Sequence, residues 1–234
     1  MFKYQGLQDM IFMVLYCVAA FFALVAAVYL LWRRGNAFAE DVGSSHVLRR
    51  WTAAFMLAIV GSHVWWYAIG QWWLTDDWTV RTILVIMMDY STLVPLAMGV
   101  LLAMLQDRRR PLWPWLVAMS PIVIFAVVGI AGRDTFYGFE LTHWWQLAVA
   151  ALFVTYYIYA LRQYGHWLLD NYADLEHKEV WQSLLFAVCL FLIYQVYTSN
   201  GGELLREYLS QVITLVIIAF LVWRVETLQE LKDD

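Results

Sequence analysis

Asp89 and His63 lie in the middle of long apolar stretches, where they could bind a ligand or hold a proton. Asp89 lies nine residues beyond Val80, about 13 Å along a helix, which predicts a position near the bilayer midplane. A charge there costs about 2.5 kcal/mol or more, so it must face other helices or a wet cavity. Arg81 can face the same interior. These residues predict either a ligand site or proton-linked switch, or a set of hydrogen bonds that only locks packing.

A second polar set lies on one face of the last apolar stretch. Glu203, Arg206, Glu207, Ser210 and Thr214 recur at helical spacing, and Gln211 lies beside them. Tyr197 and His143 come from the ends of two earlier stretches. Together these residues predict a polar, aromatic-rimmed ligand cavity open to the outer side. Arg206 could bind an anionic ligand there or pair with Glu203 or Glu207.

The sequence predicts no catalytic residue, metal ligand or cofactor, and hence no enzyme. Two histidines at these depths are too few for zinc, and neither HExxH nor Gly-x-Ser-x-Gly occurs. Cys17 and Cys189 are predicted to be small apolar fillers. The three lysines, Lys3, Lys178 and Lys232, all lie outside the apolar stretches, which excludes a retinal Schiff base.

The elements that position these residues are predicted from composition. Of 234 residues, 63% are hydrophobic and 15% are charged, an excess too large for a soluble domain. Each transmembrane helix needs about 20 apolar residues. The predicted fold is an all-α integral membrane bundle of seven helices: 10–32, 51–73, 80–105, 112–131, 141–163, 179–199 and 204–224. The fifth connection, 163–178, has no Pro or Gly after Gly165, so it is predicted to extend the flanking helices.

The basic residues predict the orientation of the chain. Eleven of them flank one set of helix ends and four flank the other. Positive charge is retained in the cytoplasm, so the N-terminus is predicted outside and the C-terminus inside. The apolar run at 10–32 is too long for a cleavable signal and is predicted to stay as a membrane anchor.

Three strings in the second half carry a resemblance to a known family: DNYADLEHKE (170–179), VYTSNGG (196–202) and LVWRVETLQEL (221–231). They resemble the seven-helix sensor part of membrane-bound AraC-type regulators of Bacteroidetes. The resemblance implies a bacterial inner-membrane location, action in pairs as a homodimer, and a cytoplasmic DNA-binding helix-turn-helix domain as output partner. It divides the chain into a sensor domain, 1–224, and a cytoplasmic helical stalk, 225–234, with Val225, Leu228 and Leu231 on one face.

The leading functional hypothesis is therefore a sensor embedded in the lipid bilayer. It detects an unknown signal, with an unknown small ligand as its partner, and controls a cytoplasmic transcriptional output. A small-solute or proton-coupled transporter that uses Asp89 and His63 is the alternative from another class. A membrane scaffold without a ligand is a third.

Overall fold

The computed structural model describes residues 10–33, 43–69, 77–175, 178–198 and 203–231, leaving aside the side chains of Trp78 and 191–207. Throughout these ranges the regular structure is helical, and no described residue is in a strand. The elements are α2 (Met10–Trp32), α3 (His46–Tyr67), α4 (Trp78–Met104), α5 (Trp113–Met119), α6 (Pro121–Gly132), η2 (Phe136–Leu141), α7 (Thr142–Asn171), α8 (Gln182–Thr198) and α9 (Glu203–Thr227). The predicted all-α class is confirmed.

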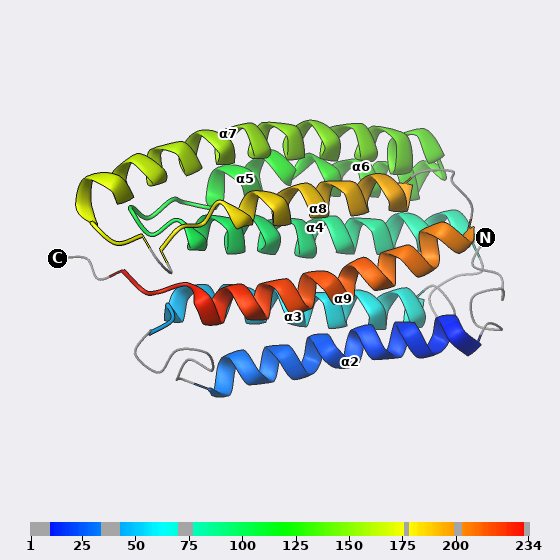
Figure 1. Ribbon diagram of the computed structural model, residues 1–234. Coiled ribbons are helices and arrows are strands. Elements are labelled where there is room, and N and C mark those ends of the chain that lie inside the picture. Colours follow the sequence, from blue (N-terminus) through cyan, green and yellow to red (C-terminus); the bar gives the residue numbers. More distant parts are fainter. Residues whose placement is uncertain (1–9, 34–42, 70–76, 176–177, 199–202, 232–234) are drawn as a thin grey trace.

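These elements form seven rods, because α5 continues into α6 and η2 into α7 (Figure 1). Five rods are long and apolar enough to cross a membrane: Met10–Trp32, Thr79–Met104, Trp113–Gly132, Phe136–Asn171 and Tyr208–Thr227. Of the other two, α8 has 17 residues and α3 carries two arginines near its start. The chain has the character of a multi-pass helical membrane protein.

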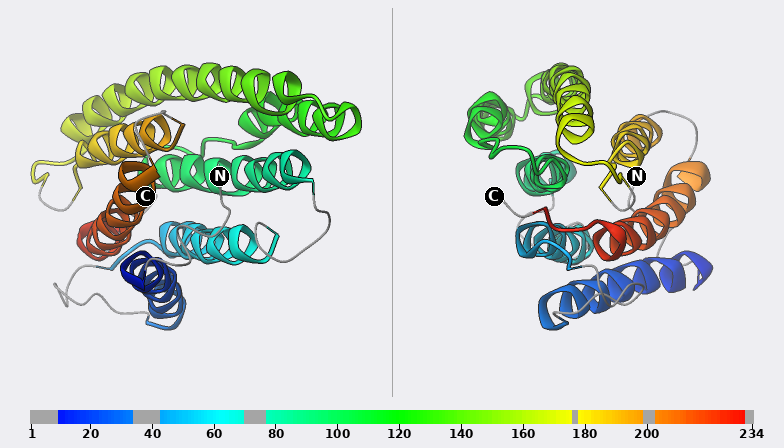
Figure 2. Two further views of the ribbon diagram at one scale, coloured as in Figure 1. Left: turned by 90° about the vertical axis from the view of Figure 1, so that its right-hand side faces the viewer. Right: turned by 60° about the vertical axis from the view of Figure 1, so that its left-hand side comes forward.

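Successive rods run in opposite directions, so the connections gather at two ends (Figure 1). One end, where α2, α4, α7 and α9 finish, is here called the basic end. Most described basic residues lie at or near it, whereas Arg81 and Arg133 lie toward the opposite end. Across the bundle, α2 packs on α3 and α9, α4 and α8 form the middle, and α5, α6 and α7 cover the far side (Figure 2).

Helix boundaries follow local chemistry. Asp77 caps α4, since its side chain accepts hydrogen bonds from the main-chain N–H groups of Thr79 (3.0 Å) and Val80 (3.4 Å). The predicted extension into 163–178 is confirmed for α7, which continues to Asn171, and is wrong for the next helix, α8, which begins only at Gln182. By contrast, α3 begins at His46 rather than at 51, so the helix includes two arginines that were predicted to flank it.

One of those arginines, Arg49, is buried at the basic end and is paired with a residue of α9. Its Nη2 lies 2.5 Å from Oε1 of Glu226, and the two side chains are 3% and 0% exposed. The remaining donors reach Oγ of Ser44 (2.5 Å) and the carbonyl oxygen of Arg33 (2.8 Å). Burial of a guanidinium costs several kcal/mol, and an ion pair with further hydrogen bonds of this kind offsets that cost. The ion pair therefore fastens the ends of α2, α3 and α9 together.

The helical stalk predicted over 225–234 is wrong for residues 228–231, which are the described residues that follow α9. The helix ends at Thr227, and the following residues pack back onto the bundle, with Leu228 completely buried. The side chain of Gln106 accepts from the N–H of Leu231 (2.8 Å) and donates to the carbonyl of Gln229 (2.9 Å). The N–H of Glu230 also donates to the carbonyl oxygen of Gly43 (2.7 Å). These three hydrogen bonds take the place of the main-chain hydrogen bonds that a continuing helix would form. Residues 232–234 lie outside the described part.

Breaking the buried ion pair is expected to be costly. Glu226→Gln keeps the side-chain shape but leaves Arg49 as a buried cation without a counter-charge. We expect the free energy of unfolding to fall by about 3 kcal/mol, measured by denaturant titration in detergent micelles.

The matched control is the exposed pair of Arg133 and Asp77, whose atoms lie 3.2 Å apart. Arg133→Gln should cost less than about 1 kcal/mol, because an exposed pair is weak. The double variant Arg49→Met, Glu226→Leu should recover most of the loss. Equal, small losses for Glu226→Gln and Arg133→Gln would contradict a structural role for the buried pair.

Candidate functional site

The imidazole of His63 joins α3 to α9 halfway along the bundle. His63 is buried, with Nδ1 2.8 Å from the carbonyl oxygen of Ile59 and Nε2 2.9 Å from Oε1 of Gln211. A carbonyl can only accept, so Nδ1 carries a proton. If the ring is neutral, Nε2 must accept from the amide NH₂ of Gln211; if it is cationic, Nε2 donates to the amide oxygen. Protonation of His63 and the orientation of Gln211 are therefore coupled.

Tyr16 of α2 completes this contact. Its hydroxyl donates to the carbonyl oxygen of His63 (2.6 Å), and the two ring centroids are 4.5 Å apart. Tyr16 also contacts the ring of Phe12, which in turn packs edge-on against Tyr208 of α9, at 5.9 Å. Three helices thus meet around one imidazole, and the predicted inward position of His63 is confirmed.

Asp89 of α4 lies against the end of α3 and accepts two hydrogen bonds from tryptophans. Nε1 of Trp65 is 2.9 Å from Oδ1, and Nε1 of Trp66 is 2.5 Å from Oδ2. An indole N–H donates only, so it suits an acceptor-only carboxylate. Gly61 leaves the space for this arrangement, because a Cβ atom there would lie 2.6 Å from the Trp65 ring.

The two tryptophans are functional-site residues that the sequence did not assign. Both lie one or two residues before the end of α3 at Tyr67, whereas the helix predicted over 51–73 placed them deeper than the bilayer interface that tryptophan prefers. That predicted depth was the one available signal. The hydrogen bonds to Asp89 give each indole N–H its partner inside the bundle. His63 lies close enough to Asp89 for an electrostatic interaction between the two side chains, so Asp89 and the His63–Gln211 pair form one polar cluster shared by α3, α4 and α9. We call this the central cluster.

The other predicted site residues are placed as follows. Arg81 is half-buried in the first turn of α4, about 12 Å along that helix from Asp89. His143 is in the first turn of α7, its ring 5.6 Å from that of Trp144, in the α5–α7 layer rather than against α3 and α9 (Figure 1). The side chains of Tyr197, Arg206 and Glu207 lie outside the described residues.

The predicted polar face of α9 is visible in its described part. Ser210 and Gln211 are buried, and the hydroxyl of Thr214 donates to the carbonyl oxygen of Ser210 (2.8 Å). Within the described part of the chain, no three His, Cys, Asp or Glu side chains gather closely enough to hold a metal ion. The contacts that the central cluster makes in the described residues are hydrogen bonds.

Comparison of the chain with protein-family models, with curated proteins and with solved structures found no match.

The indole–carboxylate contact can be measured by a double-mutant cycle. We expect Trp66→Phe and Asp89→Leu to be less destabilising together than the sum of the single changes, because both remove the same bond. The coupling should be about 1.5 kcal/mol, the usual value for a hydrogen bond to a charged group. Unfolding in detergent followed by circular dichroism gives the three free energies.

Trp145 supplies the control for this cycle. Its Nε1 donates to the carbonyl oxygen of Ala118, 2.8 Å away and remote from Asp89. Trp145→Phe combined with Asp89→Leu should be additive. A coupling energy of zero for Trp66 and Asp89 would remove the indole from the central cluster.

Proposed function

We propose that this chain is a seven-span membrane sensor in which α9 links the central cluster to the basic end. The observation that carries this proposal is a pair of buried polar contacts between the same two helices. Gln211 of α9 meets His63 of α3 at mid-bundle (2.9 Å), and Glu226 meets Arg49 at the basic end (2.5 Å). The two contacts are 15 residues apart in α9 and 14 apart in α3, about 22 Å in each helix.

Such a two-point connection favours a switch over a static scaffold. A helix that turns or slides to change its hydrogen bond with His63 must also change the position of Glu226. Buried polar contacts have few acceptable geometries, so packed helices tend to move between discrete arrangements. A ligand or a proton that favours one state of the His63–Gln211 pair would therefore bias the basic end. The resemblance to AraC-type regulators supports a cytoplasmic DNA-binding domain as the output, in a homodimer.

The excess of basic residues at one end supports a cytoplasmic location for that end, in a bacterial inner membrane. This orientation predicts that green fluorescent protein fused after Asp234 will fluoresce. Alkaline phosphatase inserted between Gly132 and Gly138 should be active, because that connection is at the opposite end.

Exchanging the two reporters between the sites provides the control, and each exchanged fusion should be inactive. Phosphatase activity from the C-terminal fusion would reverse the orientation and remove the proposed cytoplasmic output.

The coupling through α9 predicts that damage to the central cluster loosens the basic end. In a chain with Cys17→Ala and Cys189→Ala, Gln229→Cys places a thiol next to the bond between Gln106 and the chain after α9. Adding Gln211→Leu removes the bond to His63. We expect maleimide to label the cysteine at position 229 about fivefold faster. The reason is that losing a hydrogen bond worth roughly 1 kcal/mol raises the population of the state in which this segment is detached from the bundle by about that factor.

Val212 is the matched control for this experiment. It is the next residue of α9, but its side chain is 46% exposed on the outer surface of the bundle. Val212→Leu should leave the labelling rate unchanged. If Gln211→Leu also leaves the rate unchanged while the protein stays folded, α9 does not transmit and the sensor proposal is wrong.

A further inference from the structure

A groove of about 320 Å³ lies at the basic end, between the last turns of α7 and the segment that enters α8. Its lining is mainly hydrocarbon, with Tyr164 on the wall and Arg162, His166 and Glu179 as the polar residues. The apolar part of the wall comes from Leu161, Leu168, Leu169, Leu175, Val180 and Trp181. This composition suits an amphiphile rather than a water-soluble ligand.

The groove lies at the depth of lipid headgroups. Helix α7 has 30 residues and is about 45 Å long, whereas the hydrocarbon core of a bilayer is about 30 Å thick. Helix α7 is therefore long enough for its last turns to extend from the hydrocarbon core into the headgroup region. Trp181 and Leu169 are 61% and 66% exposed there, with no described element covering them. Trp181 has the amphipathic character that tryptophan shows at this level.

An arginine for which the described residues provide no ion pair is buried behind the wall of the groove. Arg224 of α9 is 3% exposed; its Nη2 donates to the main-chain oxygen of Glu179, and its Nε has no hydrogen-bond partner. Within the described part of the chain no carboxylate lies within ion-pair distance of it; the exposed carboxylate of Glu179 acts on it only at longer range. Buried cations normally need compensation, so this one leaves positive potential beside the groove.

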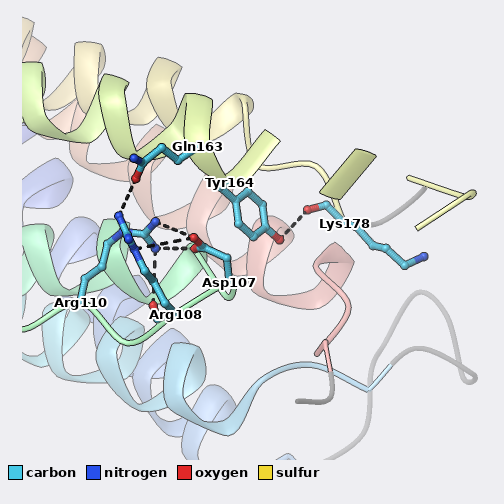
Figure 3. A network of polar contacts seen from close by, with 6 residues as sticks. All are labelled: Asp107, Arg108, Arg110, Gln163, Tyr164 and Lys178. Carbon is cyan, nitrogen blue, oxygen red and sulfur yellow. Dashed lines mark hydrogen bonds and ion pairs between the residues drawn. The ribbon is translucent and has the colours of Figure 1, made fainter. Parts of the chain in front are cut away.

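The neighbouring arginines show that Arg224 is exceptional. Arg110 forms a two-pronged ion pair with Asp107, at 2.5 and 2.8 Å, and Arg108 donates to the side chain of Gln163, at 2.5 Å (Figure 3). The hydroxyl of Tyr164 points away from that pair and donates to the main-chain oxygen of Lys178 (3.1 Å), which fixes the wall (Figure 3). Two arginines next to the groove, Arg162 at the rim and Arg224 behind the wall, have no ion-pair partner among the described residues.

We propose that this groove binds an anionic phospholipid from the leaflet at the basic end. Arg162 contacts the phosphate directly, Arg224 adds attraction from behind the wall, and the acyl chains lie over the leucines and Trp181. Basic pockets beside transmembrane helices recognise anionic headgroups in this way. The assignment does not depend on the sensor role, since it requires only that the chain lies in a membrane.

Native mass spectrometry of the detergent-solubilised chain tests the proposal. Phosphatidylglycerol should bind more tightly than phosphatidylcholine, by about fivefold for each arginine that acts on the phosphate. Arg162→Gln should reduce this preference about fivefold, while Arg50→Gln, an exposed arginine of α3 outside the groove, should leave it unchanged.

Gly165 offers a way to fill the groove without disturbing the core. It lines the groove, and a Cβ atom built on it meets nothing within 4 Å. Gly165→Leu should abolish the bound phosphatidylglycerol, and Gly165→Ala, with a similar gain in helix propensity but little bulk, should retain it. Neither variant depends on altering the buried Arg224.

Three results would overturn the proposal. Equal binding of the two lipids would show that the groove is a hydrophobic surface without selectivity for the headgroup. Displacement of phosphatidylglycerol by millimolar inorganic phosphate would show a free-anion site instead of a lipid site. Undiminished binding to the Gly165→Leu protein would place the lipid elsewhere.

Discussion

The polar interface between α3 and α9 is the constraint on which the rest of the bundle depends. In a membrane, helices gain little from burying apolar surface against one another, because lipid is equally apolar. Specific contacts must then select one packing, and α3 makes them with two neighbouring helices. It contacts α9 through His63 and Arg49, and it contacts α4 through the indoles of Trp65 and Trp66. Helix α3 thus makes specific polar contacts with two of its neighbours, α4 and α9.

Close packing supports the same arrangement. The buried alanines of α2 let its backbone approach α3 and α9 closely, as small residues do between membrane helices. On the other side of α3, Gly99 of α4 lies under the ring of Trp51, where a Cβ atom would be 2.4 Å from the ring. These contacts bring Tyr16 to the carbonyl of His63 and Asp89 to the two indoles. The central cluster is therefore a product of how closely three backbones approach.

The sequence predicted the helices well and their partners poorly, for physical reasons. Apolar block length alone predicts rods such as α2, and the absence of Pro and Gly predicts the extension of α7. The start of α3 was misplaced because Arg49 enters a helix only when a carboxylate 177 residues away neutralises it. Local patterning also predicted a stalk after Arg224, whereas Gln106, from a distant connection, redirects the chain. Asp89 was recognised as costly, but its indole partners required three-dimensional information.

The distance in sequence between Arg49 and Glu226 has a consequence for biosynthesis. At 5–20 residues per second, a ribosome needs roughly 10 to 35 s to add the 177 residues that separate them. During that interval α3 has already emerged with an arginine that lacks its counter-ion. A nascent chain in this state must be sheltered by the insertion machinery or keep Arg49 near the aqueous surface. Completion of α9 then becomes the step at which the charge of Arg49 is neutralised.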